Sequence, residues 1–197
     1  METCKHGSGA GSRKPTAEMR QGAECRAYMI STVEAESPDI LLLGAGPRFM
    51  TDGEKSMTSF FGLFRKKVDD VLEHASCPVA IFVNRDYRNG DEVAVLINGS
   101  MDSFLFTYVR RLLEDGGSFI HLYYFSSGSE EYVGQIYKIN KQYANRVHLY
   151  PLVEIEDLVL PIIHGLLILS YDTCVGIAAN EKVFKALPSL LVMKDAS

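Results

Sequence analysis

Short apolar runs alternate with amphipathic segments along most of the chain, and this alternation predicts an α/β protein. Residues 40–43 form an all-apolar run between Pro38 and Gly44, which is typical of a strand covered on both faces. In residues 60–75, apolar side chains recur every three or four positions, so this segment predicts an amphipathic helix. A second apolar strand, residues 78–83, follows directly. This order is expected of a layer with parallel strand pairing.

The alternation restarts after residue 91 and continues to the C-terminus. The predicted strands are residues 92–97, 118–125, 146–153, 166–171 and 189–193, and the predicted helices are residues 104–114, 130–143, 157–164 and 175–187. These strands and helices make a complete doubly wound unit, whereas the first part of the chain holds only two strands. Because so few strands cannot shield their own apolar faces, we expect the first part to share a sheet or an interface. Its partner is the second part, a second copy of the chain, or a further stretch of polypeptide.

These patterns divide the chain into four parts. Residues 1–15 are rich in Gly and Ser and predict a flexible leader. Residues 16–83 form a partial unit that begins with a helix ending before Pro38, residues 84–91 form a polar linker, and residues 92–197 form the second unit. The predicted fold is a doubly wound, mostly parallel sheet with one partial and one complete unit.

Composition and charge exclude several classes of protein. The chain has 197 residues, with 20 Lys and Arg against 25 Asp and Glu and a net charge of −5, which argues against a nucleic-acid partner. The longest uncharged stretch, residues 158–171, is interrupted by Pro161 and Gly165 and is too short to span a bilayer. The N-terminus lacks an apolar signal segment, and the four cysteines form no CxxC pair, so we expect a cytoplasmic protein with free thiols.

Two segments carry a resemblance to a known family. Residues 38–44 (PDILLLG) and 74–83 (HASCPVAIFV), separated by a glycine-bearing loop and a helix, resemble the C-terminal half of a universal stress protein domain. The resemblance implies an adenine nucleotide alpha hydrolase-like fold, a loop for nucleotide phosphates, and a dimer contact along the strand that follows Cys77. The dimer residues it implies, with those of the last predicted strand, are Pro78, Val79, Ile81, Val83, Leu190 and Val192.

The next segments extend the resemblance. Residues 83–86 (VNRD), joined to a new strand, and residues 99–103 (GSMDS), leading into a helix with Arg110-Arg111-Leu112-Leu113, resemble the cytosolic C-terminal region of monovalent cation/proton antiporters. In those exchangers a membrane transport domain precedes two degenerate stress-protein-like units. The resemblance implies a non-catalytic regulatory and dimerisation domain at the cytosolic face of a membrane. Its partners would be the transport domain of the same sodium or potassium exchanger and a second copy of the chain.

Nucleotide binding is a less direct implication, because the glycine motif departs from that of the family. A long spacer separates Gly46 from Gly62, and Leu63 follows where the family has a hydroxyl residue. The second unit has one glycine in the equivalent turn, residues 170–176. If an adenine nucleotide binds, its candidate residues are Gly44, Gly46, Arg48, Gly62, Gly99, Ser100 and Asp102. For Ser100 and Asp102 we favour a simpler role, capping the helix that follows.

No residue pattern indicates catalysis or a metal site. The chain contains no G-x-S-x-G, HExxH or P-loop motif, and its histidines lack zinc spacing. We interpret His121 as a structural residue within a strand, with a pH-sensing role as the alternative. We interpret Cys77 as a buried, unreactive thiol. We therefore favour an antiporter regulatory domain that senses a nucleotide or pH. The alternative is a free-standing nucleotide-binding stress protein, and the third interpretation is a hydrolase on the same scaffold.

Overall fold

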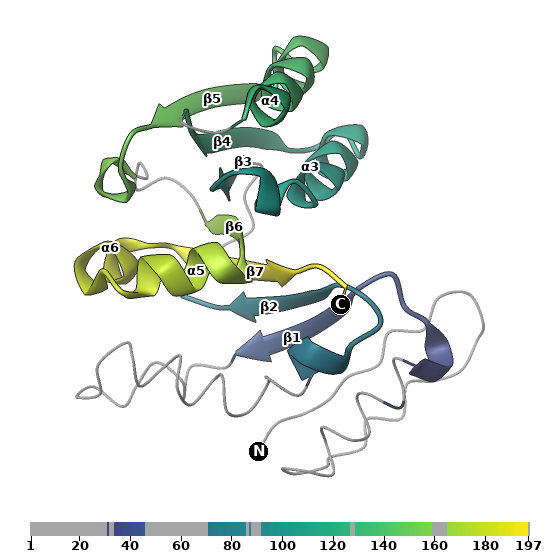
Figure 1. The fold of residues 1–197 in the computed structure, drawn as a ribbon. Coiled ribbons are helices and arrows are strands. Elements are labelled where there is room, and N and C mark those ends of the chain that lie inside the picture. Colours follow the sequence, from purple (N-terminus) through teal and green to yellow (C-terminus); the bar gives the residue numbers. More distant parts are fainter. Residues whose placement is uncertain are drawn as a thin grey trace.

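The computed structural model describes residues 31, 34–45, 71–85, 87, 92–126, 129–158 and 165–196. Its centre is a seven-stranded sheet (Figure 1). The strands are β1 (Leu41–Ala45), β2 (Val79–Val83), β3 (Glu92–Ile97), β4 (Phe119–Phe125), β5 (Val147–Leu152), β6 (Leu166–Ser170) and β7 (Ser189–Lys194). Their order in space is β1-β2-β7-β6-β3-β4-β5, and every neighbouring pair except β2 and β7 is parallel. The predicted α/β class and mostly parallel sheet are confirmed.

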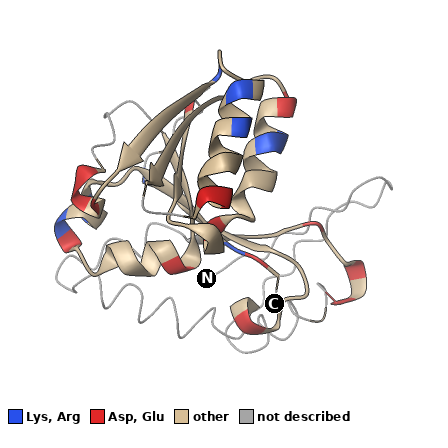
Figure 2. Ribbon diagram, turned by 45° about the horizontal axis from the view of Figure 1, so that its top comes forward, with Lys and Arg blue, Asp and Glu red and all other residues tan. Residues whose placement is uncertain are grey.

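Helices cover both faces of the sheet. The helices α3 (Leu105–Glu114) and α4 (Glu130–Gln142) pack on one face, while α5 (Tyr171–Ala178) and α6 (Glu181–Ala186) pack on the other (Figure 1). Two short 3-10 turns, η2 (Ser100–Asp102) and η3 (Ile155–Asp157), follow β3 and β5. Figure 2 shows the charged residues mainly on helices and turns, with the strands almost free of them. In the described part of the chain, no helix combines the length and apolar character that a bilayer crossing needs.

The helix predicted over residues 175–187 is two helices and starts earlier. Ser170 ends β6 and also caps α5, because its side chain accepts a hydrogen bond from the backbone N–H of Thr173 at 3.1 Å. A second cap at Asn180, which accepts from the N–H of Val183 at 3.2 Å, starts α6. In the region predicted as helix 157–164, the described residues show only the end of η3 and Leu158.

The two faces of the sheet carry separate apolar clusters, as the alternation of side chains along a strand requires. On the side of α3 and α4, the cluster includes Ile97, Ile120, Phe106 and Tyr132. On the side of α5 and α6, it includes Ile81, Leu96, Leu169 and Phe184. Together these clusters make up the core that positions the turns described below.

The partial unit pairs with the second unit of the same chain. The antiparallel contact joins β2 to β7 with Ile81 opposite Val192, so of the three partners considered for the first segment, the structure shows the second segment. This corrects our assignment of these strands to a contact between two copies. The residues Val79, Ile81, Val83, Leu190 and Val192 are all buried inside the chain's own sheet, and Pro78 lies half-buried just before β2. The apolar pattern is the same in both cases, because a buried antiparallel pair needs apolar residues whether one chain or two supplies it.

The pairing β1-β2 against β7-β6 has an approximate twofold symmetry about the β2–β7 contact. In this relation Leu42, which pairs with Ala80, is equivalent to Ile168, which pairs with Leu191. Ile168 pairs with Val95 of β3, belongs to the apolar cluster on the α3 side of the sheet, and is 4% exposed. Leu42 is 63% exposed. The strand β1 thus holds the place of β6, but within the described residues it has no second neighbouring strand such as the one β3 provides for β6.

Candidate functional site

The topology places the first candidate site at the carboxyl ends of β3 and β6. The chain continues from β3 to β4 on one side, while β6 lies on the other side of β3, so the strand order reverses between β3 and β6. Open α/β sheets bind ligands at such a switch point. Here it is formed by the turn from Asn98 to Asp102 and by the start of α5 at Ser170.

A buried carboxylate occupies this switch point. Asp102 is only 3% exposed, and its Oδ2 accepts hydrogen bonds from the backbone N–H of Asn98 at 2.8 Å and from the hydroxyl of Thr173 at 2.8 Å. Gly99 has a φ of 111°, a conformation that residues with a Cβ rarely adopt, and this turns the chain so that Asp102 points back toward β3. Asp102 therefore ties the end of β3 to the first turn of α5.

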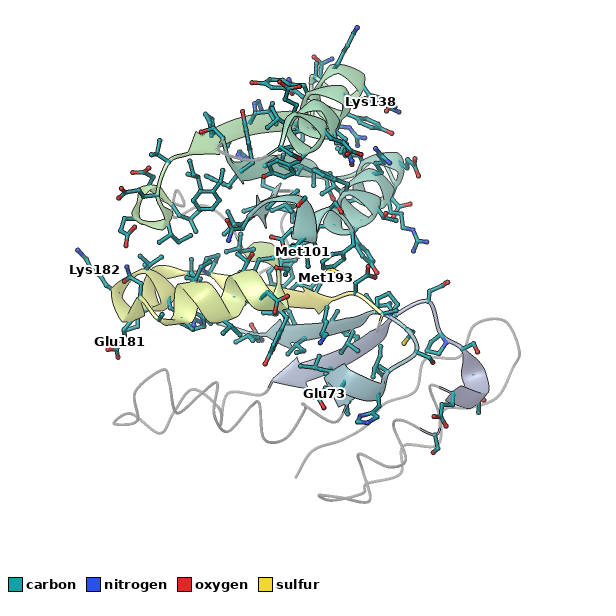
Figure 3. The ribbon with its side chains drawn as sticks, in the orientation of Figure 1. Glu73, Met101, Lys138, Glu181, Lys182 and Met193 are labelled. Atoms are coloured by element: carbon teal, nitrogen blue, oxygen red, sulfur yellow. The ribbon has the colours of Figure 1, made fainter. Side chains whose placement is uncertain are left out.

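The capping role expected for Ser100 or Asp102 is wrong. The helix α3 begins after Phe104 without a side-chain cap. The carboxylate of Asp102 instead accepts hydrogen bonds from Asn98 and Thr173. Ser100 is exposed, and so is its neighbour Met101, at 83% (Figure 3). The two candidate residues thus differ: one is an internal tie and the other lies at the surface.

Tyr132 covers the same edge of the sheet from the first turn of α4. Its hydroxyl donates to the carbonyl oxygen of Ile97 at 2.9 Å, and the residue is 2% exposed. Burial raises the pKa of Tyr132 to about 12, while the backbone at Gly99 lowers it to a smaller extent. The end of β3 is consequently held by side chains of the chain itself.

This buried phenol predicts a loss of stability at alkaline pH. Below pH 10, Tyr132 is protonated in both the folded and the unfolded protein, but between pH 10 and about 12 only the unfolded chain releases the proton. The free energy of unfolding should therefore fall as pH rises through this window, by about 2–3 kcal/mol from Tyr132 alone. Urea unfolding at pH 9 and pH 11 should show about half of this loss, roughly 1.4 kcal/mol, because pH 11 lies midway through the window. An equal loss in Tyr132→Phe would contradict this assignment.

The other nucleotide candidates do not join this group. Gly44 lies in β1, and the strands β2, β7 and β6 separate it from β3. Gly46, Arg48 and Gly62 lie outside the described residues. Of the seven candidates, the structure therefore brings together Gly99, Ser100 and Asp102.

A second polar contact, which the sequence analysis missed, joins the linker after β2 to the second unit. Arg85 follows β2, and its Nη1 donates to the carbonyl oxygens of Phe184 at 2.8 Å and Leu187 at 2.9 Å, at the end of α6. The guanidinium also lies 4.7 Å from the centre of the Phe184 ring, and the Arg85 backbone N–H donates to Ser189 Oγ at 2.8 Å. Burial lowers the pKa of Arg85 from its high ordinary value. A lone arginine after an apolar strand carries no sequence signal of this role.

Both thiols in the described part of the chain are buried. Burial raises the pKa of the Cys77 thiol, and it raises that of Cys174 to about 12 although nearby Arg85 works against it. A thiol reacts as its thiolate, so these two residues are unreactive near neutral pH, as expected for Cys77.

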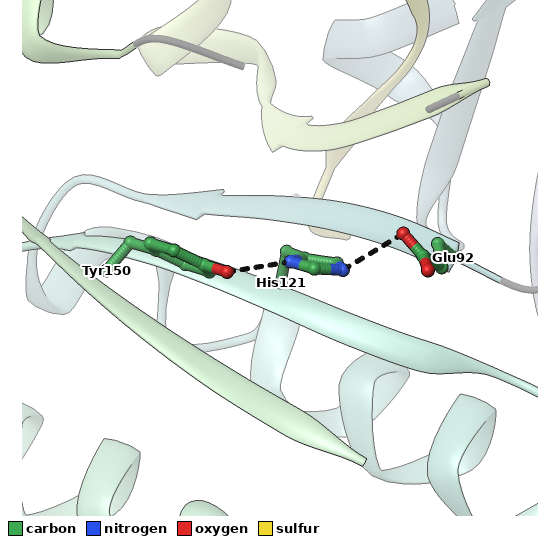
Figure 4. Close-up of polar contacts among 3 residues, drawn as sticks. All are labelled: Glu92, His121 and Tyr150. Carbon is green, nitrogen blue, oxygen red and sulfur yellow. Dashed lines mark hydrogen bonds and ion pairs between the residues drawn. The ribbon is translucent and has the colours of Figure 1, made fainter. Parts of the chain in front are cut away.

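A third cluster lies at the opposite, amino-terminal end of the sheet (Figure 4). Glu92 on β3 lies with its Oε2 3.2 Å from Nε2 of His121 on β4, and Nδ1 of His121 lies 3.2 Å from the hydroxyl of Tyr150 on β5. The ring of His148 on β5 is 5.5 Å from that of His121. The sequence analysis treated these histidines as isolated, because only strand pairing brings them together.

Comparisons with known proteins concern the fold. No protein-family model matches the sequence, and the search of curated proteins gave no match. A universal stress protein from Archaeoglobus fulgidus DSM 4304 superposes with a TM-score of 0.52 and 14% identity, over 85% of this chain and 65% of that chain, so the match spans just under two thirds of that protein. A functionally unknown protein from Pseudomonas aeruginosa PAO1 superposes with a TM-score of 0.51 and 12% identity, over 86% of this chain and 68% of that chain. The chain thus has a universal stress protein-like α/β fold.

Proposed function

We propose that the chain is a non-catalytic regulatory domain of a monovalent cation/proton antiporter that exchanges sodium or potassium, placed at the cytosolic face of the membrane. The observation that carries this proposal is the exposed apolar side chain of Leu42 on the edge strand β1. Leu42 is 63% exposed where its twofold equivalent, Ile168, is 4% exposed. Such a surface fits a domain that works attached to further protein, as the resemblance of residues 83–86 and 99–103 to the antiporters implies.

The switch point supports a role without catalysis. The end of β6 runs directly into α5, and the side chain of Ser170 is engaged with the N–H of Thr173. Asp102 adds a buried carboxylate at the same place, which opposes a phosphate group by charge. In this proposal the domain acts by linkage, because a ligand or proton that binds one arrangement of the domains better shifts the transport equilibrium by that difference in affinity.

The gene tests the assignment to an antiporter. Sequencing the transcript upstream of the codon for residue 1 should reveal about a dozen apolar segments, each of about 20 residues. Where they are found, cation/proton exchange is measured in vesicles that contain the exchanger with and without residues 38–197. A reading frame that begins at residue 1, or equal exchange and equal pH dependence in both forms, would overturn the proposal.

A free-standing nucleotide-binding stress protein is the second candidate function, favoured by the fold and by Gly44 at the end of β1. Titration calorimetry with ATP and AMP separates the two. With the switch point closed by Asp102, we expect no saturable heat at nucleotide concentrations up to about 1 mM, which corresponds to less than about 4 kcal/mol of binding free energy. Micromolar ATP binding would favour the second candidate. An ATP titration of the Asp102→Asn variant shows whether the carboxylate is what excludes the phosphates.

The proposed homodimer needs a surface other than β2 and β7. Because these strands pair with each other, we place the contact at β1, an edge strand of the sheet whose Leu42 is 63% exposed. Sedimentation equilibrium of the wild type and of Leu42→Lys measures the association. A dimer that persists unchanged in Leu42→Lys would place the contact elsewhere.

A further inference from the structure

The Glu92–His121–Tyr150 cluster is built by the register of three strands. His121 lies directly opposite His148, and Tyr123 lies opposite Tyr150, in the parallel pairing of β4 and β5. Glu92 lies one diagonal step from His121, because Ala94 is the residue of β3 opposite His121. The alternation of strands places all five side chains on the face that α5 and α6 cover further along the sheet.

The rings in this cluster stack on one another. The ring of Tyr150 is 4.8 Å from that of Tyr123 with an angle of 17° between planes, and 5.7 Å from that of His121 with an angle of 23°. His148 is tilted by 33° relative to His121 and is exposed. The side chain of His121 is 15% exposed and that of Glu92 is 43% exposed. The imidazole of His121 is thus held in position but can still exchange protons with water.

The geometry assigns a role to each ring nitrogen of neutral His121. Glu92 can only accept when it is ionised, so Nε2–H donates to its carboxylate, and Nδ1 then accepts from the hydroxyl of Tyr150. When a second proton binds at Nδ1, the Tyr150 hydroxyl can rotate and accept instead. Both protonation states therefore satisfy the same pair of neighbours without moving the imidazole.

We propose that Glu92, His121, Tyr150 and His148 form a proton-binding site that responds to pH between about 5 and 8, the range in which imidazole ordinarily titrates. As a signal to an exchanger the site rests on the proposed function, whereas proton binding by the chain itself does not.

Charge decides how many protons the site holds. Among the described residues, the titratable groups that face His121 are Glu92 from β3 and Tyr150 and His148 from β5. Glu92 attracts a protonated His121 at 3.2 Å, whereas a protonated His148 at 5.5 Å repels it. Two such cations repel each other at this distance. The geometry thus favours a single positive charge in the cluster, held next to the Glu92 carboxylate.

Proton binding at His121 is coupled to the core through Tyr150. It converts a hydrogen bond between β3 and β4 into an ion pair and reverses the Tyr150 hydroxyl. Tyr150 stacks on Tyr123, which is 3% exposed and belongs to the cluster beneath α5 and α6. The amino ends of β3, β4 and β5 should consequently be held together more firmly in the protonated state.

Nitrogen NMR of the imidazole rings in the whole chain tests the site, with signals recorded between pH 8.5 and 5. At high pH the spectrum should show His121 as the Nε2–H tautomer, and lowering the pH should add one proton at Nδ1. Glu92→Gln should lower the proton affinity of His121 by roughly three- to tenfold, because an amide cannot attract the cation. Tyr150→Phe should leave uptake intact but shift the Nδ1 signal of the neutral ring, since its donor is lost.

Matched controls keep these outcomes distinct. His74→Gln removes an exposed imidazole from another part of the chain and should leave the His121 curve unchanged. Circular dichroism confirms that each variant folds; if Glu92→Gln does not, Glu92→Ala read at the same pH values replaces it. A His121 ring that stays neutral down to pH 5, or one that titrates identically without the Glu92 carboxylate, would overturn the proposal. Neither result bears on whether the chain belongs to an exchanger.

Discussion

Replacement of Arg85 by alanine is expected to lower the free energy of unfolding by about 3 kcal/mol. The guanidinium donates to two carbonyl oxygens at the end of α6, those of Phe184 and Leu187, and lies over the Phe184 ring. Hydrogen bonds from a charged donor contribute about 1.5–3 kcal/mol, and the carbonyl oxygens left behind lose their partners. Because Arg85 lies in the linker directly after β2 and Phe184 lies in the second unit, the loss should loosen the packing of the linker against α6.

Chemical unfolding in urea, followed by far-ultraviolet circular dichroism, measures this change. Arg85→Lys keeps the charge but not the fork of donors, and should therefore recover only part of the stability. The control is Lys182→Ala on the outer face of α6 (Figure 3), which should change stability by less than about 0.5 kcal/mol. If Arg85→Ala is as stable as that control, Arg85 does not hold the linker against α6.

Asp102→Ala should have the second large effect, a loss of about 2–4 kcal/mol. It removes the acceptor for the N–H of Asn98 and for the hydroxyl of Thr173, and both donors would be left near the centre of the fold. An unsatisfied buried polar group costs about 1–3 kcal/mol, and the vacated volume adds to this. The connection between β3 and α5 should weaken first, so amide hydrogen exchange at Thr173 should accelerate more than exchange in β4.

Two further variants show whether the carboxylate acts as a tie. Asp102→Asn keeps an oxygen acceptor of the same shape and should recover about half of the lost stability. Ser100→Ala, in the same turn but exposed, should be neutral to within about 0.5 kcal/mol. Equal destabilisation by Ser100→Ala and Asp102→Ala would mean that the turn, and not the buried carboxylate, matters.

The strands were predictable because each carries its own signal. The apolar runs predicted at residues 92–97, 166–171 and 189–193 correspond to β3, β6 and β7 to within one residue at each end. A strand covered on both faces must be apolar throughout, and this requirement is local to the sequence. The break between α5 and α6 was missed because each helix starts at a single capping residue, Ser170 or Asn180, which the spacing of apolar residues does not mark.

The site was predictable only in part. Residues 99–102 were singled out because a glycine-bearing turn after a strand is where this class of fold places functional groups, and the structure does put Asp102 at the switch point. One of the donors to Asp102 is Thr173, which lies 71 residues further along the chain, so the sequence of the turn does not predict this hydrogen bond. Phe184, a partner of Arg85, is likewise far away in the sequence, 99 residues further along the chain.

The sequence by itself determined the class of the fold, because the spacing of apolar residues is a local consequence of which faces each element must bury. Only the tertiary structure decided that the two apolar strands β2 and β7 meet within one chain, since an apolar edge looks the same whether its own chain or another covers it. It also decided that Glu92, His121 and Tyr150 touch. They come from three strands, and the register of those strands sets the distances between them. The sequence of each strand alone does not reveal that register.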